Sequence, residues 1–475
     1  MPGAVSPHGH PEPDPTVPIV SVPIVTANGS QRIMLYWERF APVNACHVLE
    51  LGPNCLTTWD QFREIAPQVL RSLGIGEVTA DAWASRYEIR PVGECDVSSV
   101  WVTGNFDRGI EEAIDQEFLR PFATTSCPVR FLWIEESGPG ATPPSQTPPR
   151  RVIAVVYRHA IADGASIRVI CQHLIATCCG RTVDRSLSPY VGHLLRDLRH
   201  GLQPPGLWGT LRYAVNELMG LARCVFPKIK TLSALDRSIT RLHAERVPVT
   251  QIRATADACG VTVQDLLFAA TLESMIQEDS HEPRSLFRSK LALQCPVDLR
   301  PFLGAGSGEQ FGQLLGSYQV RHTVRASSTF QEILTQTHRQ TILQKQQNRA
   351  AYYPLSMGLI SFLSRHFPGQ SGFKTTKSMF PLVGGISNLN LADQFRDEFE
   401  SGTVVRYARA THLGHILPMM LFVTSFGEDV TFLSTRRESF LDDEAMRRIV
   451  AHLARRASGD GDSPADDFSG RASHV

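Results

Sequence analysis

Residues 151–166, RVIAVVYRHAIADGAS, are the stretch on which the interpretation of this chain depends. The apolar run at 152–157 is short and does not alternate with polar residues, which is typical of a strand buried on both faces. His159 follows this run, and Asp163 and Gly164 come shortly after it. A strand end is a rigid support for a reactive side chain. The stretch therefore predicts a buried strand that carries His159 at its end.

The spacing His-x-x-x-Asp is not specific by itself, because the chain contains it three times. The match that begins at His10 lies in a proline-rich segment, which cannot hold a reactive geometry. The match that begins at His193 has helical spacing and is interpreted as an exposed i, i+4 pair. The match at His159 follows the predicted buried strand, has glycine directly after the aspartate and leads into a predicted helix. This context, rather than the spacing, singles out His159.

An imidazole has an ordinary pKa near 6.5, so His159 is expected to be largely neutral and able to take a proton from an alcohol or an amine. Asp163 is expected to turn either beneath this imidazole or away into the protein. Gly164 is expected to allow backbone angles that other residues resist. The structural alternative is a buried histidine whose only role is to end a strand.

The bulk composition favours a two-domain globular protein without a charged partner. The chain has 475 residues, and its 47 basic and 47 acidic side chains balance, so neither nucleic acid nor an anionic membrane is predicted as a partner. Its apolar runs are shorter than the roughly 20 residues that span a bilayer. The first residues lack the basic region of a signal peptide. We therefore predict a cytoplasmic protein without a membrane span.

The ten cysteines show no CxxC pairs or spacing to histidine that would suggest zinc, so no metal site is predicted. The sequence also lacks the GxSxG, Walker A and HExxH motifs. No permanently bound cofactor is expected.

Predicted strands and helices alternate along the chain, which indicates an α/β fold. Residues 128–136 are predicted as a strand, 56–75 as a helix, and 32–40 as a strand-like or mixed segment. A strongly amphipathic helix is expected to begin at Thr262. A hairpin is expected to turn at Gly427.

Five segments occur in an order that is known from one superfamily. They are PFATTSCPVRFLWIEE (121–136), HAIADG (159–164), GVTVQDLLFAA (260–270), PVDLRPFL (296–303) and GGISNLN (384–390). With them the chain resembles the HxxxDG acyltransferases of the chloramphenicol acetyltransferase-like superfamily. The resemblance is closest to polyketide-associated acyltransferases and fungal alcohol acyltransferases, and more distant to condensation domains and the plant BAHD enzymes.

The resemblance implies two similar subdomains, each a mixed β-sheet with flanking helices, which form a tunnel at their interface. The N-terminal acyltransferase subdomain with the HxxxDG motif is predicted at 28–185 and the C-terminal one at 241–458, joined by a crossover at 186–240. Disordered tails are predicted at 1–27 and 459–475.

The resemblance also implies roles for individual residues. His159 corresponds to the catalytic base, and Asp163, with Gly164 beside it, has a structural role. Asp163 is expected to pair with an arginine from the second half, for which Arg300 in PVDLRP is the candidate. A surface arginine in a turn is the alternative for Arg300.

Ser387 and Asn388 in GGISNLN are candidates for contact with the acyl carbonyl or its oxyanion. The alternative is that both are turn residues that satisfy the local backbone. His412 and His415 are interpreted as structural residues.

The implied activity is O-acyl transfer from a CoA or carrier-protein thioester, as the cosubstrate, to the hydroxyl of a small molecule. The acceptor is expected to be a secondary-metabolite, polyketide or lipid-like alcohol, and a carrier protein of a polyketide synthase is a possible partner. Condensation domains usually have two adjacent histidines, whereas here Arg158 precedes His159, which argues against peptide-bond formation. Two alternatives stay open, namely N-acyl transfer to an amine and a non-catalytic binding protein. A monomer is expected.

Overall fold

The computed structural model describes most of residues 23–460. The gaps are residues 82, 91–94, 137–148, 184–185, 202–214, 218, 229–236, 280, 282–284, 286, 304–308, 326, 367–380 and 415–416. Most of each predicted disordered tail lies outside the described residues. Strand β1 (Ile24–Thr26) nevertheless starts before the predicted boundary at residue 28, because it pairs with a strand of a small sheet.

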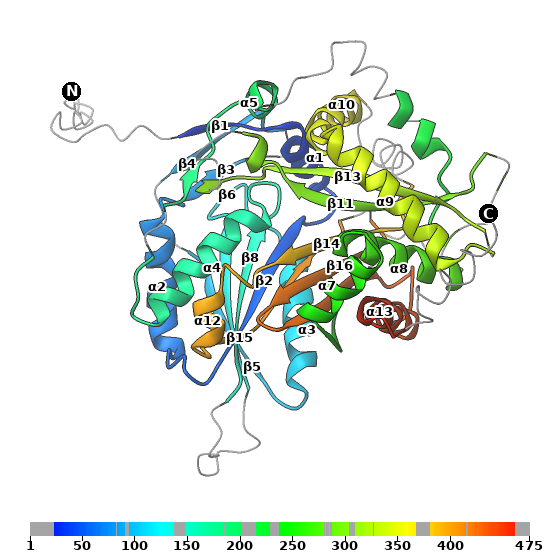
Figure 1. Cartoon of the computed structure of the whole chain (residues 1–475). Coiled ribbons are helices and arrows are strands. Elements are labelled where there is room, and N and C mark those ends of the chain that lie inside the picture. The colour runs from blue at the N-terminus through cyan, green and yellow to red at the C-terminus, as the bar shows by residue number, and fades with distance from the viewer. Residues whose placement is uncertain are drawn as a thin grey trace, which may run out of the picture.

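Within the described residues, two larger mixed sheets form the framework (Figure 1). The first has the order β15 (Val404–Thr411), β2 (Asn44–Leu51), β8 (Arg151–Arg158), β7 (Val129–Glu136) and β5 (Val97–Val102). The second has the order β10 (Ser238–Pro248), β17 (Asp429–Arg437), β16 (Met419–Phe426), β14 (Gly384–Asn390), β11 (Lys290–Asp298) and β13 (Leu315–Thr323).

Two small sheets complete the strand pairing of the described residues. One has the order β1, β4 (Arg86–Arg90), β3 (Glu77–Thr79) and β6 (Thr125–Ser126), and the other pairs β12 (Gln310–Phe311) with β9 (Ser188–Pro189). Because β9 and β12 come from different halves of the sequence, the second small sheet ties the halves together.

The helices have the following bounds: α1 (Gly29–Trp37), α2 (Trp59–Ser72), α3 (Phe106–Leu119), α4 (Gly164–Cys178), α5 (Leu194–Gly201), α7 (Val249–Ala258), α8 (Val263–Gln277), α9 (Phe330–Gln346), α10 (Tyr353–His366), α12 (Arg396–Glu400) and α13 (Asp443–Ser458). The short 3₁₀ helices are η1 (Arg300–Phe302) and η3 (Arg349–Tyr352).

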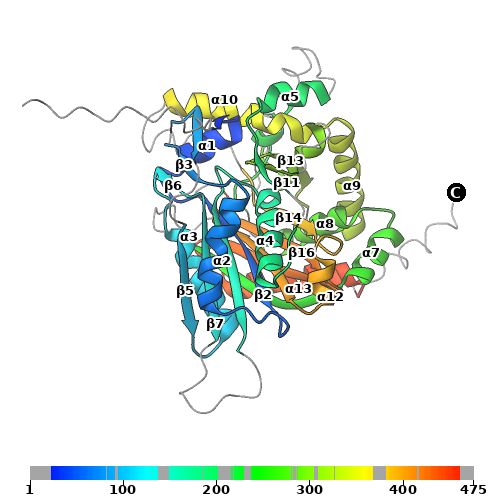
Figure 2. The same ribbon diagram turned by 90° about the vertical axis from the view of Figure 1, so that its left-hand side faces the viewer.

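Among the described residues, four apolar cores hold these elements together, and the smallest packs α1 and α10 against β11. Helices α2 and α4 pack on one face of the first sheet, and α7, α8, α9 and α13 pack on one face of the second (Figures 1 and 2). Helix α3 and the remaining face of the first sheet share a core with β16 and β17. This third core joins the two halves. Strand β8 is buried on both faces, as its apolar run predicts.

The two halves exchange structure rather than meeting as separate units. Strand β15 follows β14 in the chain, yet it pairs with β2 at the edge of the first sheet. Strand β10 starts at Ser238, inside the segment predicted as a crossover. A linear division of the sequence therefore does not describe the two sheets, because sheet pairing depends on long-range contacts.

Two sequence-based expectations about helices are wrong. Residues predicted as strand-like at 32–40 form most of α1, because Asn28 and Gln31 make a reciprocal capping box at its start. Helix α8 is opened by Thr262 as predicted, but it is buried on nearly all sides rather than amphipathic, since α9 and α13 cover it.

Among the described helices, none alone has the length and hydropathy of a membrane-spanning helix. Helices α7 and α8 taken together reach that length and hydropathy, but the chain bends by 85° between them.

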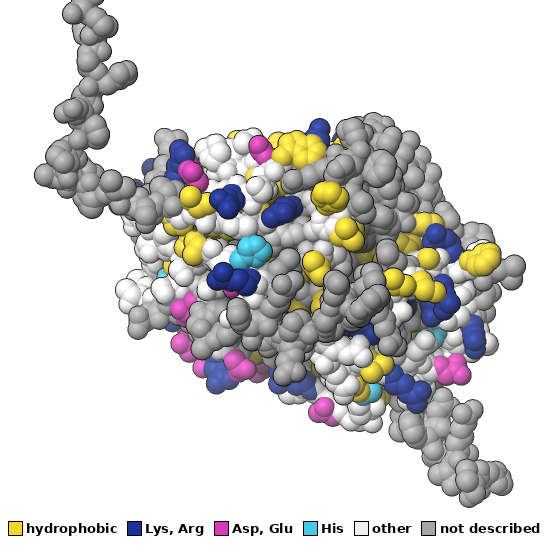
Figure 3. Space-filling model, turned by 90° about the horizontal axis from the view of Figure 1, so that it is seen from above, with side chains coloured by type: hydrophobic (Ala, Val, Ile, Leu, Met, Phe, Trp, Pro, Cys, Tyr) yellow, Lys and Arg dark blue, Asp and Glu magenta, His cyan; other side chains and the backbone are white. Residues whose placement is uncertain are grey.

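The face that carries α10, seen from above, mixes hydrophobic side chains with arginine and lysine (Figure 3). Among the side chains of that helix that the structure describes, Leu359 and Phe362 are the most exposed apolar ones.

Candidate active site

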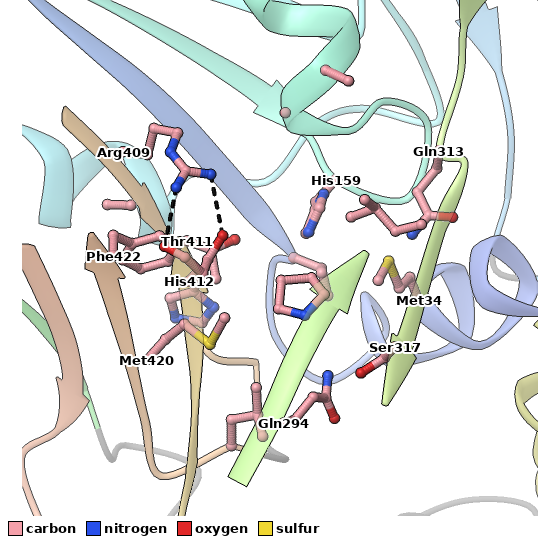
Figure 4. Close-up of a pocket in the computed structure, with 18 of the residues that line it drawn as sticks. Met34, His159, Gln294, Gln313, Ser317, Arg409, Thr411, His412, Met420 and Phe422 are labelled. Atoms are coloured by element: carbon pink, nitrogen blue, oxygen red, sulfur yellow. Dashed lines mark hydrogen bonds between the residues drawn. The ribbon is translucent and has the colours of Figure 1, made fainter. Parts of the chain in front are cut away.

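A cavity of about 340 Å³ lies where the two halves meet, and its walls come from both larger sheets. Residues that follow β8 and the start of α4 form one wall, and β11, β13, β14 and β15 supply the others. The volume falls in the range of small-molecule binding sites. Figure 4 shows His159 pointing into this cavity.

His159 is held rigidly just after β8. Its backbone N–H donates to the carbonyl of Val43 at 2.9 Å, and its ring Nδ1 lies 3.1 Å from the carbonyl oxygen of Ala162. A carbonyl can only accept, so Nδ1 carries the proton and Nε2 keeps its lone pair. Burial lowers the pKa of His159, which the Ala162 carbonyl and the charge of Asp163 oppose. The imidazole is therefore neutral at neutral pH, with Nε2 free to accept a proton.

Asp163 turns away from this imidazole and caps α4. Its carboxylate accepts from the backbone N–H of Ser166 at 3.0 Å and from that of Leu314 at 2.8 Å. It also accepts hydrogen bonds from two N–H groups of Arg300, at 2.9 and 3.0 Å. Burial alone would raise the pKa of Asp163, but Arg300 and the backbone donors hold it below its ordinary value.

Arg300 comes from the second half, directly after β11, and is 2% exposed. Besides Asp163, it binds the carboxylate of Asp298 at 3.0 Å and the carbonyl of Gln310 at 2.8 Å. The structure thus brings Asp163 and Arg300 together across the two halves. A surface arginine in a turn is excluded.

Gly164 lies in a tightly packed position and does not have unusual backbone angles. Its φ lies outside the left-handed region that favours glycine. A Cβ at this position would lie 3.2 Å from Nε2 of His47, which is tighter than ordinary packing. The expectation about backbone angles is therefore wrong, and the close approach of His47 to the start of α4 explains the glycine.

Ser387 and Asn388 lie on β14 and line the cavity, so they are strand residues rather than turn residues. The hydroxyl of Ser387 accepts an N–H from Arg409 at 3.1 Å, and its carbonyl accepts another at 3.1 Å (Figure 4). Because Arg409 can only donate, the Ser387 hydroxyl keeps its own hydrogen for a further acceptor.

His412 also lines the cavity, and its Nδ1 accepts the backbone N–H of Gly414 at 3.2 Å. Its ring packs edge-on against Phe118. His415 lies outside the described residues.

Several residues of the cavity are not predicted from the sequence. His47 on β2 is buried, and a hydrogen bond of 2.5 Å joins its Nδ1 to the hydroxyl of Tyr407. Burial lowers its pKa well below the ordinary value, helped by the positive charges of Arg409 and Arg168. The ring of Tyr157 packs edge-on between His47 and His159, with centroid distances of 5.8 and 5.6 Å. No local pattern marks His47, because it lies alone in an ordinary strand, and Tyr157 belongs to the apolar run of β8, which predicts burial rather than a place in the cavity wall.

The side chain of Arg158 lies outside the cavity that His159 faces. It binds the carboxylate of Glu38, with Nη2 at 2.7 Å, and the carbonyl of Ala80. Among the described residues, those that line the cavity do not include Arg158. Its side chain therefore does not contact a substrate in this cavity.

No group of three or more histidine, cysteine, aspartate or glutamate side chains in the described parts of the chain is arranged to hold a metal ion.

Of three comparisons with known proteins, the comparison with solved structures gives matches and the other two do not. A scan against protein-family models finds no match, and a search of curated proteins finds none. Among solved structures, the condensation domain of the monacolin K polyketide synthase MokA matches with a TM-score of 0.64 and 14% identity, covering 92% of this chain and 97% of that one.

Two further solved structures match with similar TM-scores and identities. The first condensation domain of the calcium-dependent antibiotic synthetase, solved with a substrate analogue, gives a TM-score of 0.62 at 12% identity and covers 92% of this chain and 97% of that one. The cyclization-docking bidomain of the EpoB non-ribosomal peptide synthetase from Sorangium cellulosum gives 0.59 at 12% identity and covers 93% and 86%. The predicted α/β class is thereby confirmed: this chain has the two-subdomain fold of condensation domains. The tunnel between the subdomains stays a prediction.

Proposed function

We propose that the protein is an acyltransferase that moves an acyl group from a thioester to a hydroxyl, with His159 as the general base. The observation that carries the proposal is the free Nε2 of His159, which faces a cavity between the two halves of this fold. A neutral imidazole on a rigid support meets the requirement for base catalysis near neutral pH. The thioester is acyl-CoA or an acyl chain on a carrier protein.

The proposed reaction needs no acyl-enzyme. Nε2 of His159 takes the hydroxyl proton while the acceptor oxygen forms a bond to the thioester carbon. The negative charge that develops on the carbonyl oxygen receives a hydrogen bond from the hydroxyl of Ser387, or from the amide of Asn388. The C–S bond then breaks, and the leaving thiolate takes the proton back from His159. An ester and a free thiol result.

Amide formation on an amine acceptor is the second candidate. The likeness to condensation domains favours it. The argument against it from Arg158 loses force, because that side chain binds Glu38 and is not among the cavity residues. The same base serves an amine, so only the acceptor distinguishes the two reactions.

The experiment follows thiol release from acetyl-CoA and longer acyl thioesters, with an alcohol and an amine of matched carbon skeleton. We expect release that depends on the acceptor and a product of the corresponding mass. His159→Ala should lower the rate by about 10²–10⁴-fold. Thiol release without acceptor would indicate a hydrolase. An unchanged rate in His159→Ala would refute the proposed base.

A non-catalytic binding protein would behave differently. It would release no thiol from any donor, and His159→Ala would change only its affinity for a ligand. Chromatography of the protein with acyl-carrier protein, before and after the substitution, separates this case from catalysis.

A further inference from the structure

Two arginines that line the cavity form no ion pair with a carboxylate of the described residues. Arg409 on β15 is 9% exposed, and within the described parts of the chain its two terminal nitrogens donate to Ser387 alone. Arg168 on α4 lines the same cavity and makes no hydrogen bond or ion pair with any residue that the structure describes. The Nε atoms of both arginines are buried and lack a hydrogen-bond partner among those residues.

A buried guanidinium without a counter-charge is costly and is retained where it has a use. Burial lowers the pKa of Arg409 to about 10, so it is still protonated at neutral pH. Both arginines lower the pKa of His47, which shows that their positive charges act on the same part of the cavity. The potential there is therefore positive.

The charges around the cavity do not balance. Arg168, Arg300 and Arg409 are three positive groups, whereas Asp163 and Asp298 are two negative ones that share Arg300. His47 and His159 are neutral, because burial lowers the pKa of each. One positive charge is left over. A single carboxylate would balance it.

This positive region lies close to the proposed base. The ring of His47 packs against Tyr157, and Tyr157 packs against His159. Figure 4 shows Arg409 and His159 on separate walls of one cavity. A ligand that reaches Arg409 and Arg168 therefore lies in the same cavity as the group that reacts at His159.

We infer that the cavity takes a substrate with a free carboxylate, which binds Arg168 and Arg409 beside the reacting group. Guanidinium and carboxylate form charge-assisted hydrogen bonds and fit each other in geometry. The inference rests on the proposed function only in placing this carboxylate on a substrate. The carboxylate belongs to the acyl group, as in a dicarboxylic acyl thioester, or to the acceptor, as in a hydroxy acid.

A binding experiment tests the inference without any catalysis. Calorimetric titration compares glutarate with its uncharged counterpart glutaramide on the full chain. We expect binding of glutarate and none of glutaramide. Arg168→Met should weaken the affinity for glutarate about tenfold or more, the loss of one charge-assisted hydrogen bond. Arg253→Met, on the exposed face of α7, should leave it unchanged.

A kinetic experiment identifies the source of the carboxylate. Butyryl-CoA is compared with succinyl-CoA, and 1-hexanol with 6-hydroxyhexanoate, in the thiol-release assay. A preference for succinyl-CoA that falls in Arg168→Met places the carboxylate on the acyl group. A preference for the hydroxy acid that falls in the same variant places it on the acceptor.

The outcomes separate the inference from the proposed function. Absence of glutarate binding overturns the inference and leaves acyl transfer standing. Equal losses with charged and neutral substrates in Arg168→Met also overturn it, because the arginines would then act on the oxyanion. Glutarate binding that depends on Arg168, without transfer from any thioester, upholds the inference while the proposed function fails.

Discussion

Arg300 and Arg168 both lie where the two halves meet, and the charge of Arg300 acts on Arg168, yet their surroundings differ. Arg300 is fully buried and binds two carboxylates and a backbone carbonyl. Arg168 is only partly buried and has no direct partner among the described residues. The first arginine is part of the architecture, because its charge is satisfied by the protein. The second is available to a ligand, because its charge is not.

Replacing Arg300, the arginine that binds two carboxylates, should have the largest effect on the stability of the fold. Arg300→Ala strands the buried carboxylate of Asp163, and we expect the free energy of unfolding to fall by about 3–5 kcal/mol. Denaturant unfolding measures the loss. Arg300→Lys keeps the charge but not the two-pronged contact, so its loss should be intermediate. A change below about 1 kcal/mol in Arg300→Ala would show that the pair does not hold the halves together.

Ser387 binds Arg409 and also lines the cavity in which the proposed reaction takes place. Ser387→Ala removes the hydroxyl proposed to stabilise the oxyanion and should lower kcat of acyl transfer by about 10²–10³-fold. Ser387→Thr retains a hydroxyl and should recover part of the rate. If alanine and threonine have the same rate as the unsubstituted protein, the serine serves only to hold Arg409.

Removing the unpaired arginine should hardly affect folding. Arg168→Met deletes a charge that makes no hydrogen bond or ion pair with any described residue and keeps an apolar side chain of similar length. We expect the free energy of unfolding to change by less than about 1 kcal/mol, or to rise. A loss as large as that of Arg300→Ala would mean that Arg168 is a structural residue, and the contrast between the two arginines would disappear.

The smallest expected effect is a shift in pH dependence. Burial lowers the pKa of His159, so the base stays neutral, and active, to a pH below its ordinary value near 6.5. The acidic limb of kcat/KM should therefore lie below that value. Circular dichroism at each pH separates this limb from unfolding. A limb above pH 6.5 would contradict the assignment of His159 as a desolvated neutral base.

Much of the local structure follows from sequence patterns. The two-subdomain α/β class follows from the resemblance that five motifs carry. The β8 strand, the helix start at Thr262 and the hairpin at Gly427 are predicted correctly from local patterns. Each depends on short-range periodicity or on turn chemistry. The prediction for 32–40 fails because a capping box outweighs the strand-like composition.

The sequence by itself determined where a histidine would follow a buried strand, because local patterns and the order of five motifs define that stretch. Tertiary structure alone decided what surrounds it. Strand β15 returns to the first sheet and brings Arg409 to the cavity, and β2 brings His47. Residues that are far apart in sequence become neighbours only through sheet pairing, so no local pattern reveals the positive wall that they form.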